Sequence, residues 1–154
     1  MKLGIVGSGG IVKDVLIALK PINTIETQAI WVRPHSEAKG QDLAQENNIP
    51  QVYTNYEAFL KQADIDTAYI GLVNSAHYEY AKKALLAGHN VIVEKPFGSN
   101  LREVQELIQL AKEKNLGGCF PASYAKFPQA AGAAAKAWAY PHGTGQLLPV
   151  FQPL

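Results

Sequence analysis

The sequence predicts an α/β fold with a doubly wound parallel sheet, and three features of the chain indicate it. Short apolar segments alternate with amphipathic segments at helical spacing along residues 1–116. The chain opens with an apolar strand at residues 3–6, which runs directly into a glycine-rich turn and then a helix. Glycine, proline and asparagine separate the segments. Strict alternation of strand and helix favours a parallel sheet with helices on both faces.

The first half of the chain is expected to hold three strands and three helices. The strands are β-rich segments at residues 3–6, 27–32 and 52–53. One helix starts near Gly10 and is closed by Pro21. A second has Ser36 as its N-cap and runs to about Glu46, and a third is short and begins near Tyr56.

The second half continues the alternation. Strands are expected at residues 67–72 and 90–93, and a short segment near Leu116 could add a sixth strand. A helix at residues 77–87 stops at Gly88. Another runs from its cap Asn100 to Lys114. Its apolar stripe is expected to face the core and consists of Leu101, Val104, Leu107, Ile108 and Ala111.

Composition narrows the classes of function. The chain has 154 residues, of which 47% are hydrophobic and 18% charged, as in a globular domain with a sizeable core. The net charge of +1 gives no basic surface for nucleic acid. The apolar runs are too short to span a bilayer. We therefore expect neither nucleic acid nor a membrane as a partner.

Cysteine and histidine are sparse. Cys119 is the only cysteine, which excludes an intrachain disulfide and a thiolate metal cluster. The four histidines lack metal-ligand spacing, so no metal site is expected; they are His35, His77, His89 and His142. The chain starts with a strand, which leaves no signal peptide, and we expect a cytoplasmic protein.

The glycine-rich turn after the first strand has the properties of a pyrophosphate site. Gly7 can turn tightly, and Gly9 has no Cβ, so phosphates can approach the backbone. The helix from Gly10 directs unpaired N–H groups and its positive dipole end at the anion. We expect dinucleotide contacts from Gly7, Ser8, Gly9, Gly10 and Ile11.

One departure from the motif and one alternative reading weigh against a binding site at this turn. The third glycine position of the dinucleotide-binding Rossmann motif is Val12, a departure expected to move the helix slightly away from the strand. The alternative is a glycine-rich β–α turn that binds no ligand. The wider pattern supports a site, because four segments follow strands and should meet at one edge of the sheet. These are residues 7–10, 33–36, 72–77 and 94–96.

The segment after the second strand bears on cofactor choice. NAD-binding sheets usually place a carboxylate there to accept from the ribose hydroxyls. Here no carboxylate occurs before Glu37. Arg33 can pair with a 2′-phosphate, and Ser36 can hydrogen-bond it. We predict a preference for NADP(H), with NAD(H) possible. The alternative is that Arg33 only stacks on adenine.

Three motifs in order resemble a known family. They are the segment at residues 4–11, GIVGSGGI; the segment at residues 68–77, AYIGLVNSAH; and the segment at residues 91–96, VIVEKP. Residues 1–116 resemble the N-terminal cofactor domain of the glucose–fructose oxidoreductase / inositol dehydrogenase / MocA (Gfo/Idh/MocA) family. The resemblance implies an NAD(P)-dependent oxidoreductase that acts on sugars, polyols or related hydroxy or carbonyl compounds.

The resemblance also assigns roles to single residues. Lys95 would be catalytic, as it would hydrogen-bond the reacting oxygen and help move the proton that accompanies hydride transfer. The alternative is a solvated lysine at a strand end. Pro96 is often cis in this family. Cofactor contacts are implied near the nicotinamide for Leu72, Asn74, His77, Glu94, Lys95 and Pro96. His77 has an alternative role in packing at a helix start.

Full-length members of the family carry a second, α+β domain that holds the substrate and often forms the oligomer interface. We expect that this chain ends before that domain. Residues 117–154 are rich in alanine and proline, and their only charged residues are Lys126 and Lys136. We expect an out-of-frame or poorly ordered tail, with a frameshift near residues 116–119. The alternative is a genuine alanine-rich helix with a proline-rich end.

The expected function is therefore that of an NAD(P)-binding domain from a hydride-transferring oxidoreductase, truncated and inactive alone. Its partners would be the dinucleotide, and a small-molecule substrate only if the second domain is present. Full-length relatives would be homo-oligomers. The alternative is a non-catalytic nucleotide-binding or redox-sensing module.

Overall fold

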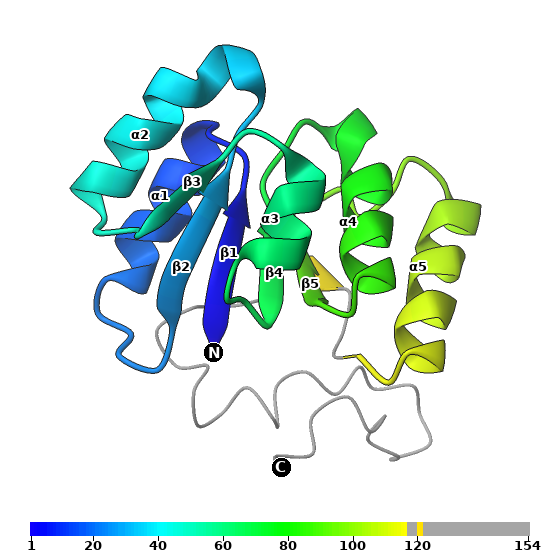
Figure 1. The fold of residues 1–154 in the computed structure, drawn as a ribbon. Coiled ribbons are helices and arrows are strands. Elements are labelled where there is room, and N and C mark those ends of the chain that lie inside the picture. Colours follow the sequence, from blue (N-terminus) through cyan, green and yellow to red (C-terminus); the bar gives the residue numbers. More distant parts are fainter. Residues whose placement is uncertain (117–119, 122–154) are drawn as a thin grey trace.

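The computed structural model describes residues 1–116 and 120–121 as one layered α/β fold (Figure 1). Its strands are β1 (Lys2–Val6), β2 (Glu26–Trp31), β3 (Gln51–Tyr53), β4 (Thr67–Ile70), β5 (Asn90–Val93) and β6 (Phe120–Pro121). Its α-helices are α1 (Gly10–Leu19), α2 (Glu37–Glu46), α3 (Tyr56–Gln62), α4 (His77–Leu86) and α5 (Leu101–Glu113). All strand pairs are parallel, in the order β3-β2-β1-β4-β5-β6. The predicted doubly wound sheet is confirmed.

The strand register aligns the carboxyl ends of the central strands. Val6 of β1 lies opposite Trp31 of β2 and Ile70 of β4, and Ile70 lies opposite Val93 of β5. The loops that follow these four strands therefore meet at one edge. The other edge carries the amino ends of the strands, where the Met1 amino group donates to the Thr24 carbonyl at 2.9 Å.

One face of the sheet is covered by α1 and α2. Side chains that point to this face alternate along the strands, as expected for pleated backbone. They contact the apolar side of α1, which explains why this helix is fixed on the sheet. The cluster includes Leu3, Ile5, Ile30 and Tyr69 from the strands, and Val12, Val15, Leu16 and Leu19 from α1.

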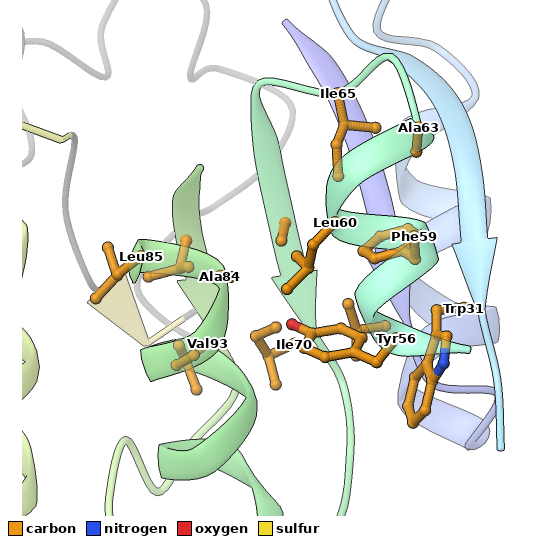
Figure 2. Packing of buried hydrophobic residues seen from close by; sticks show 14 of the residues in the cluster. Trp31, Tyr56, Phe59, Leu60, Ala63, Ile65, Ile70, Ala84, Leu85 and Val93 are labelled. Carbon is orange, nitrogen blue, oxygen red and sulfur yellow. The ribbon is translucent and has the colours of Figure 1, made fainter. Parts of the chain in front are cut away.

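The opposite face is covered by α3, α4 and α5, and Figure 2 shows part of its core. Phe59 is fully buried between α3 and the sheet. Aromatic rings gather toward the carboxyl edge, where the centroid of Trp31 lies 5.1 Å from that of Tyr56 and 5.0 Å from that of Tyr80. Tyr56 donates to the Tyr80 carbonyl at 2.9 Å, and burial raises its pKa. This cluster ties β2 to α3 and α4.

Helix signals in the sequence located most termini correctly. Asn100 caps α5 by accepting from the Glu103 N–H at 3.0 Å. Gly88 ends α4 with a φ of +92°. Ser36 precedes α2 as predicted, but its side chain makes no capping hydrogen bond, and a 3₁₀ turn at Pro34–Ser36 leads into the helix. The sixth strand lies at Phe120–Pro121 and not near Leu116.

The predicted apolar stripe of α5 is partly wrong. Leu107 and Ala111 are buried, whereas Leu101 is 71% exposed and Ile108 is 39% exposed. α5 packs against α4, and the side chains of Leu101 and Ile108 lie outside the buried part of the helix, which is centred on Leu107 and Ala111. The expectations for the tail, residues 117–154, lie outside the described residues, apart from 120–121.

Two absences hold for the described residues. None of their helices is long and apolar enough to cross a membrane. No three side chains of His, Cys, Asp or Glu in this part of the chain lie close enough to hold a metal ion together.

The packing of α5 yields a first prediction. Replacing Leu107 with Ala should lower the free energy of unfolding by about 2–5 kcal/mol, because a fully buried side chain leaves a cavity. Leu101→Ala on the same helix should change it by less than about 0.5 kcal/mol, since this side chain is exposed. Urea unfolding followed by circular dichroism measures both. Equal losses in the two variants would contradict the packing described for α5.

Candidate functional site

The carboxyl edge of the sheet contains a topological switch point between β1 and β4. From β1 the chain proceeds outward to β2 and β3, and then crosses back to β4, β5 and β6 on the other side. In open parallel sheets, loops from adjacent strands diverge at such a point, and ligands bind in the crevice beyond the carboxyl ends of the strands. All four segments predicted for the site lie along this edge (Figure 1).

The glycine-rich turn closely approaches the end of β4. The N–H of Gly71 donates to the Val6 carbonyl at 2.9 Å, and the N–H of Gly7 donates to the Trp31 carbonyl at 2.8 Å. Gly7 has a φ of +122°, and a Cβ there would lie 2.6 Å from the Gly71 carbonyl oxygen. Only glycine satisfies both conditions, so this turn depends on Gly7.

The turn leads into an open helix N-terminus. Gly9 occupies the N-cap of α1, and no side chain caps this end of the helix. Backbone N–H groups in the first turn of a helix have no partner further back in the helix. Ser8 is half-buried, whereas Gly9, Gly10 and Ile11 are exposed. The arrangement can accept an anion on backbone donors without an opposing acid, because the first turn of α1 contains none.

Val12 fits in place of the third motif glycine because of a glycine on the neighbouring strand end. Val12 is fully buried. A Cβ on Gly71 would lie 2.8 Å from the Val12 side chain and 2.8 Å from the ring of Tyr69. The space for close helix–sheet packing is therefore provided by Gly71. Sequence reasoning missed this role, since only the fold brings residues 12 and 71 together.

The segment after β2 is exposed and cationic. The Arg33 and His35 side chains are exposed, and Ser36 is half-buried. The Ser36 N–H donates to the Arg33 carbonyl at 2.8 Å, which curls the segment back toward the edge. No carboxylate intervenes before Glu37. Arg33 and Ser36 are thus close in space, in an arrangement that can receive a second anionic group.

The loop after β4 presents a mostly apolar surface. Leu72 is half-buried, and Val73 is 58% exposed. Asn74 is exposed and begins a 3₁₀ turn that leads into α4. Ile11, near the start of α1, is 42% exposed, so exposed apolar side chains follow both β1 and β4.

The segment after β5 combines a buried acid with an exposed lysine. Glu94 is 8% exposed, whereas Lys95 and Pro96 are exposed. The Lys95–Pro96 peptide bond is cis. Tyr69 donates to Glu94 Oε1 at 2.7 Å, and the Lys95 N–H donates to Glu94 Oε2 at 3.3 Å. The carboxylate is thus held inside the fold, whereas the lysine side chain is exposed.

His77 is placed differently from the other predicted contacts. Its side chain is fully buried. Nδ1 lies 2.7 Å from the Pro96 carbonyl oxygen, and Nε2 lies 2.9 Å from the Leu72 carbonyl oxygen. Both ring nitrogens therefore face main-chain acceptors and not the crevice. This geometry corresponds to the packing alternative more closely than to direct contact with a cofactor.

Comparison with known proteins supports the family that the three sequence motifs resemble. A family model described as an oxidoreductase family with an NAD-binding Rossmann fold matches residues 1–119. Trans-1,2-dihydrobenzene-1,2-diol dehydrogenase of Xenopus tropicalis is 34% identical over 115 residues, which are 75% of this chain and 35% of that protein. The chain thus spans about a third of such a curated relative.

Two solved structures share the fold. KijD10, a 3-ketoreductase from Actinomadura kijaniata in complex with TDP-benzene and NADP, is 27% identical with a TM-score of 0.71. The match covers 76% of this chain and 36% of KijD10. Apo scyllo-inositol dehydrogenase from Lactobacillus casei is 26% identical with a TM-score of 0.69, over 79% of this chain and 35% of that one.

The glycine-rich turn can be tested by stability. Gly7→Ala should lower the free energy of unfolding by more than about 2 kcal/mol, because it forces a strained φ and an overlap with backbone. Gly10→Ala is the matched control, since nothing lies within 4 Å of a Cβ there and alanine favours a helix. Urea unfolding checks both variants. A Gly7→Ala protein as stable as the wild type would disprove the close approach of residues 7 and 71.

Proposed function

Because the chain belongs to the oxidoreductase family with an NAD-binding Rossmann fold, as its motifs predict, we propose that its crevice binds NADP(H) for hydride transfer. The partner in that reaction is a sugar, polyol or related hydroxy or carbonyl compound. One observation carries the proposal. An uncapped helix N-terminus, an acid-free cationic turn and an exposed lysine lie along one edge of the sheet, next to its switch point.

The glycine-rich turn fits a dinucleotide pyrophosphate. Gly7 keeps the turn tight, and Ser8, Gly9, Gly10 and Ile11 offer backbone donors at the start of α1. The absence of an acid in this first turn means that no carboxylate repels the phosphates. These residues hold the anionic centre of the cofactor in the proposal.

The turn after β2 supports NADP(H) over NAD(H). Arg33 presents an exposed, planar guanidinium, which can pair with the doubly charged 2′-phosphate, and the Ser36 hydroxyl can add a hydrogen bond. NAD-binding sheets rely on a carboxylate at this point, and the chain has none before Glu37. The neighbour KijD10 was solved with NADP.

The loops after β4 and β5 form the nicotinamide end of the proposed site. Leu72 and Asn74 border one side, and Glu94, Lys95 and Pro96 border the other. When bound, the nicotinamide supplies or accepts the hydride. Lys95 hydrogen-bonds the substrate oxygen, stabilises the charge that develops on it, and gives or takes the accompanying proton. This role requires an exposed ammonium, and the Lys95 side chain is exposed.

The substrate class is proposed from the named relatives. They include a dehydrogenase of a dihydrobenzene diol, a 3-ketoreductase and an inositol dehydrogenase, all of which act at a hydroxyl or carbonyl carbon. This chain matches about 35% of their length. We propose that substrate contacts and the homo-oligomer interface belong to a second domain that is joined to this one in the intact enzyme.

The tail enters the proposal through its composition. We propose a frameshift near residues 116–119, with the tail after it translated out of frame, because only Lys126 and Lys136 are charged in that tail and the family match ends at residue 119. A DNA read through these codons and several hundred bases beyond tests it. An open shifted frame that encodes a β-rich domain supports the proposal. If no other frame stays open, a non-catalytic nucleotide-binding module becomes the better proposal.

Cofactor choice gives a binding prediction. The chain should bind NADPH more tightly than NADH. Arg33→Ala should lower the affinity for NADPH about 10- to 100-fold, because an ionic hydrogen bond is lost, and should change the affinity for NADH little. Isothermal titration calorimetry measures both affinities. Arg102→Ala is the matched control, as it removes an exposed arginine from α5. Equal affinity of the wild type for the two cofactors would rule out the NADP preference.

Replacing Lys95 should change hydride transfer and leave cofactor binding almost unchanged. Lys95→Ala should leave NADPH affinity within about 3-fold, since the pyrophosphate and 2′-phosphate contacts remain. In the in-frame product of the gene it should lower hydride transfer to a diol or sugar by about 10²- to 10⁴-fold. Lys114→Ala controls for loss of a lysine. Turnover near the wild-type rate in Lys95→Ala would reject the catalytic assignment.

A further inference from the structure

We propose that Tyr69 and His77 are positioning residues that hold the main chain on both sides of Lys95. Tyr69 acts through the Glu94 carboxylate, and His77 acts through the Pro96 carbonyl. The inference deepens the proposed function and rests on it, because Lys95 is the residue that the two contacts serve. Neither side chain needs to touch the cofactor or the substrate.

The first contact comes from the strand beside Lys95. Tyr69 is fully buried, and its register partner on β5 is Ile92. Glu94 lies two residues further along that strand, on the same face, within reach of the Tyr69 hydroxyl at 2.7 Å. Burial, followed by the hydrogen bond to Glu94, raises the Tyr69 pKa, so the hydroxyl keeps its proton and donates.

The Glu94 carboxylate connects Tyr69 to the peptide that leads into Lys95. Its Oε1 accepts from Tyr69, and its Oε2 accepts from the Lys95 N–H at 3.3 Å. The backbone of Glu94 is itself fixed, as its N–H donates to the Ile70 carbonyl at 3.0 Å. The peptide that leads into Lys95 is therefore attached to β4 through both backbone and side chain.

The second contact comes from the start of α4. His77 is the first residue of that helix, which is held on the sheet by its buried residues Ala81, Ala84 and Leu85. Its ring bridges the Pro96 carbonyl, at 2.7 Å from Nδ1, and the Leu72 carbonyl, at 2.9 Å from Nε2. One ring thus joins the loops after β4 and β5, and fixes the spacing between the two sides of the nicotinamide end.

The two contacts act on either side of one residue. Glu94 precedes Lys95 and Pro96 follows it, so the main chain is held just before and just after the lysine. The Lys95 side chain is exposed and has no ion pair within the described residues. The backbone is fixed while the ammonium stays available. This combination suits a group that must meet a substrate oxygen in a set place.

The chemistry of the bridge distinguishes it from simple packing. Carbonyl oxygens only accept hydrogen bonds, so a hydrogen bond at each end of the bridge needs a donor from position 77; an imidazolium supplies both donors, and a neutral ring supplies one. An asparagine side chain places its amide nitrogen near the position of Nδ1, whereas a glutamine places its own near Nε2. His77→Asn should therefore keep the Pro96 contact, and His77→Gln should keep the Leu72 contact. His77→Leu fills similar space and donates to neither.

The test is ¹⁵N relaxation of the 154-residue chain, which reports the order parameters of the Lys95 and Phe97 amides. We expect values of about 0.85 for both amides in the wild type, typical of rigid backbone, and a value below about 0.6 for Phe97 in His77→Leu and His77→Gln. His77→Asn should restore Phe97, the residue after Pro96. Tyr69→Phe should loosen Lys95 but leave Phe97 close to the wild type.

Two matched controls make the comparison specific. Tyr78→Phe removes another tyrosine–carboxylate hydrogen bond, that from Tyr78 to Glu106 at 2.6 Å, and His89→Asn removes another histidine–carbonyl contact, that of Nε2 with Leu60 at 2.7 Å. Neither should change the order parameters at Lys95 or Phe97. The Tyr69→Phe and His77→Asn variants are conservative, so they keep the test decisive if His77→Leu fails to fold.

Each outcome separates this inference from the proposed function. Rigid Lys95 and Phe97 amides in all variants, or equal values for His77→Asn and His77→Gln, would overturn the inference. An NADPH titration of the same samples tests the proposed function independently. If the order parameters change as expected and the wild type binds no NADPH, the positioning contacts stand and the proposed cofactor fails. If NADPH binds and the order parameters do not change, the proposed cofactor stands and the positioning contacts fail.

Discussion

The close approach of the ends of β1 and β4 is the constraint on which the rest of the site depends. A hydrogen bond from Gly71 to Val6 joins the two strand ends, and a Cβ on Gly7 would lie 2.6 Å from the Gly71 carbonyl oxygen. Because Gly71 has no side chain, there is room for the Val12 side chain of α1 to pack against the sheet. The same space lets the Tyr69 ring extend toward Glu94. A side chain at position 71 would therefore disturb the α1 packing and the segment that carries Lys95 together.

The candidate site has two parts, one on each side of the junction between β1 and β4. The loops after β1 and β2 provide backbone donors and a guanidinium, which suit the anionic part of a dinucleotide. The loops after β4 and β5 provide partly exposed apolar side chains, a buried acid and an exposed lysine, which suit a ring and a reacting oxygen. In the proposed function, affinity and chemistry thus depend on separate halves of the sheet. A domain of this kind can keep its cofactor end even where the substrate side differs among relatives.

Sequence reasoning found what depends on local order and missed what depends on contacts between distant residues. Strand and helix alternation, the Asn100 cap and the Gly88 stop are local, and the structure shows each of them. The role of Gly71 could not be read from the chain, because it depends on Val12, which lies on α1. Tyr69 resembled any residue of a buried strand, and only the register shows that its hydroxyl reaches Glu94. Helical periodicity also cannot tell which positions of an apolar stripe a neighbouring element covers, and so Leu101 was expected in the core.

The uniform direction of the strands has a practical consequence. The proposed cofactor crevice lies at their carboxyl ends, and the amino group of Met1, held by the Thr24 carbonyl, lies at the opposite edge with Lys2 and Asp64. An affinity tag, a fluorophore or a surface linkage at the N-terminus would therefore sit on the far side of the sheet from the crevice. Immobilising the domain through that end orients every molecule with the same edge toward the solution, which suits it to a nucleotide-sensing surface.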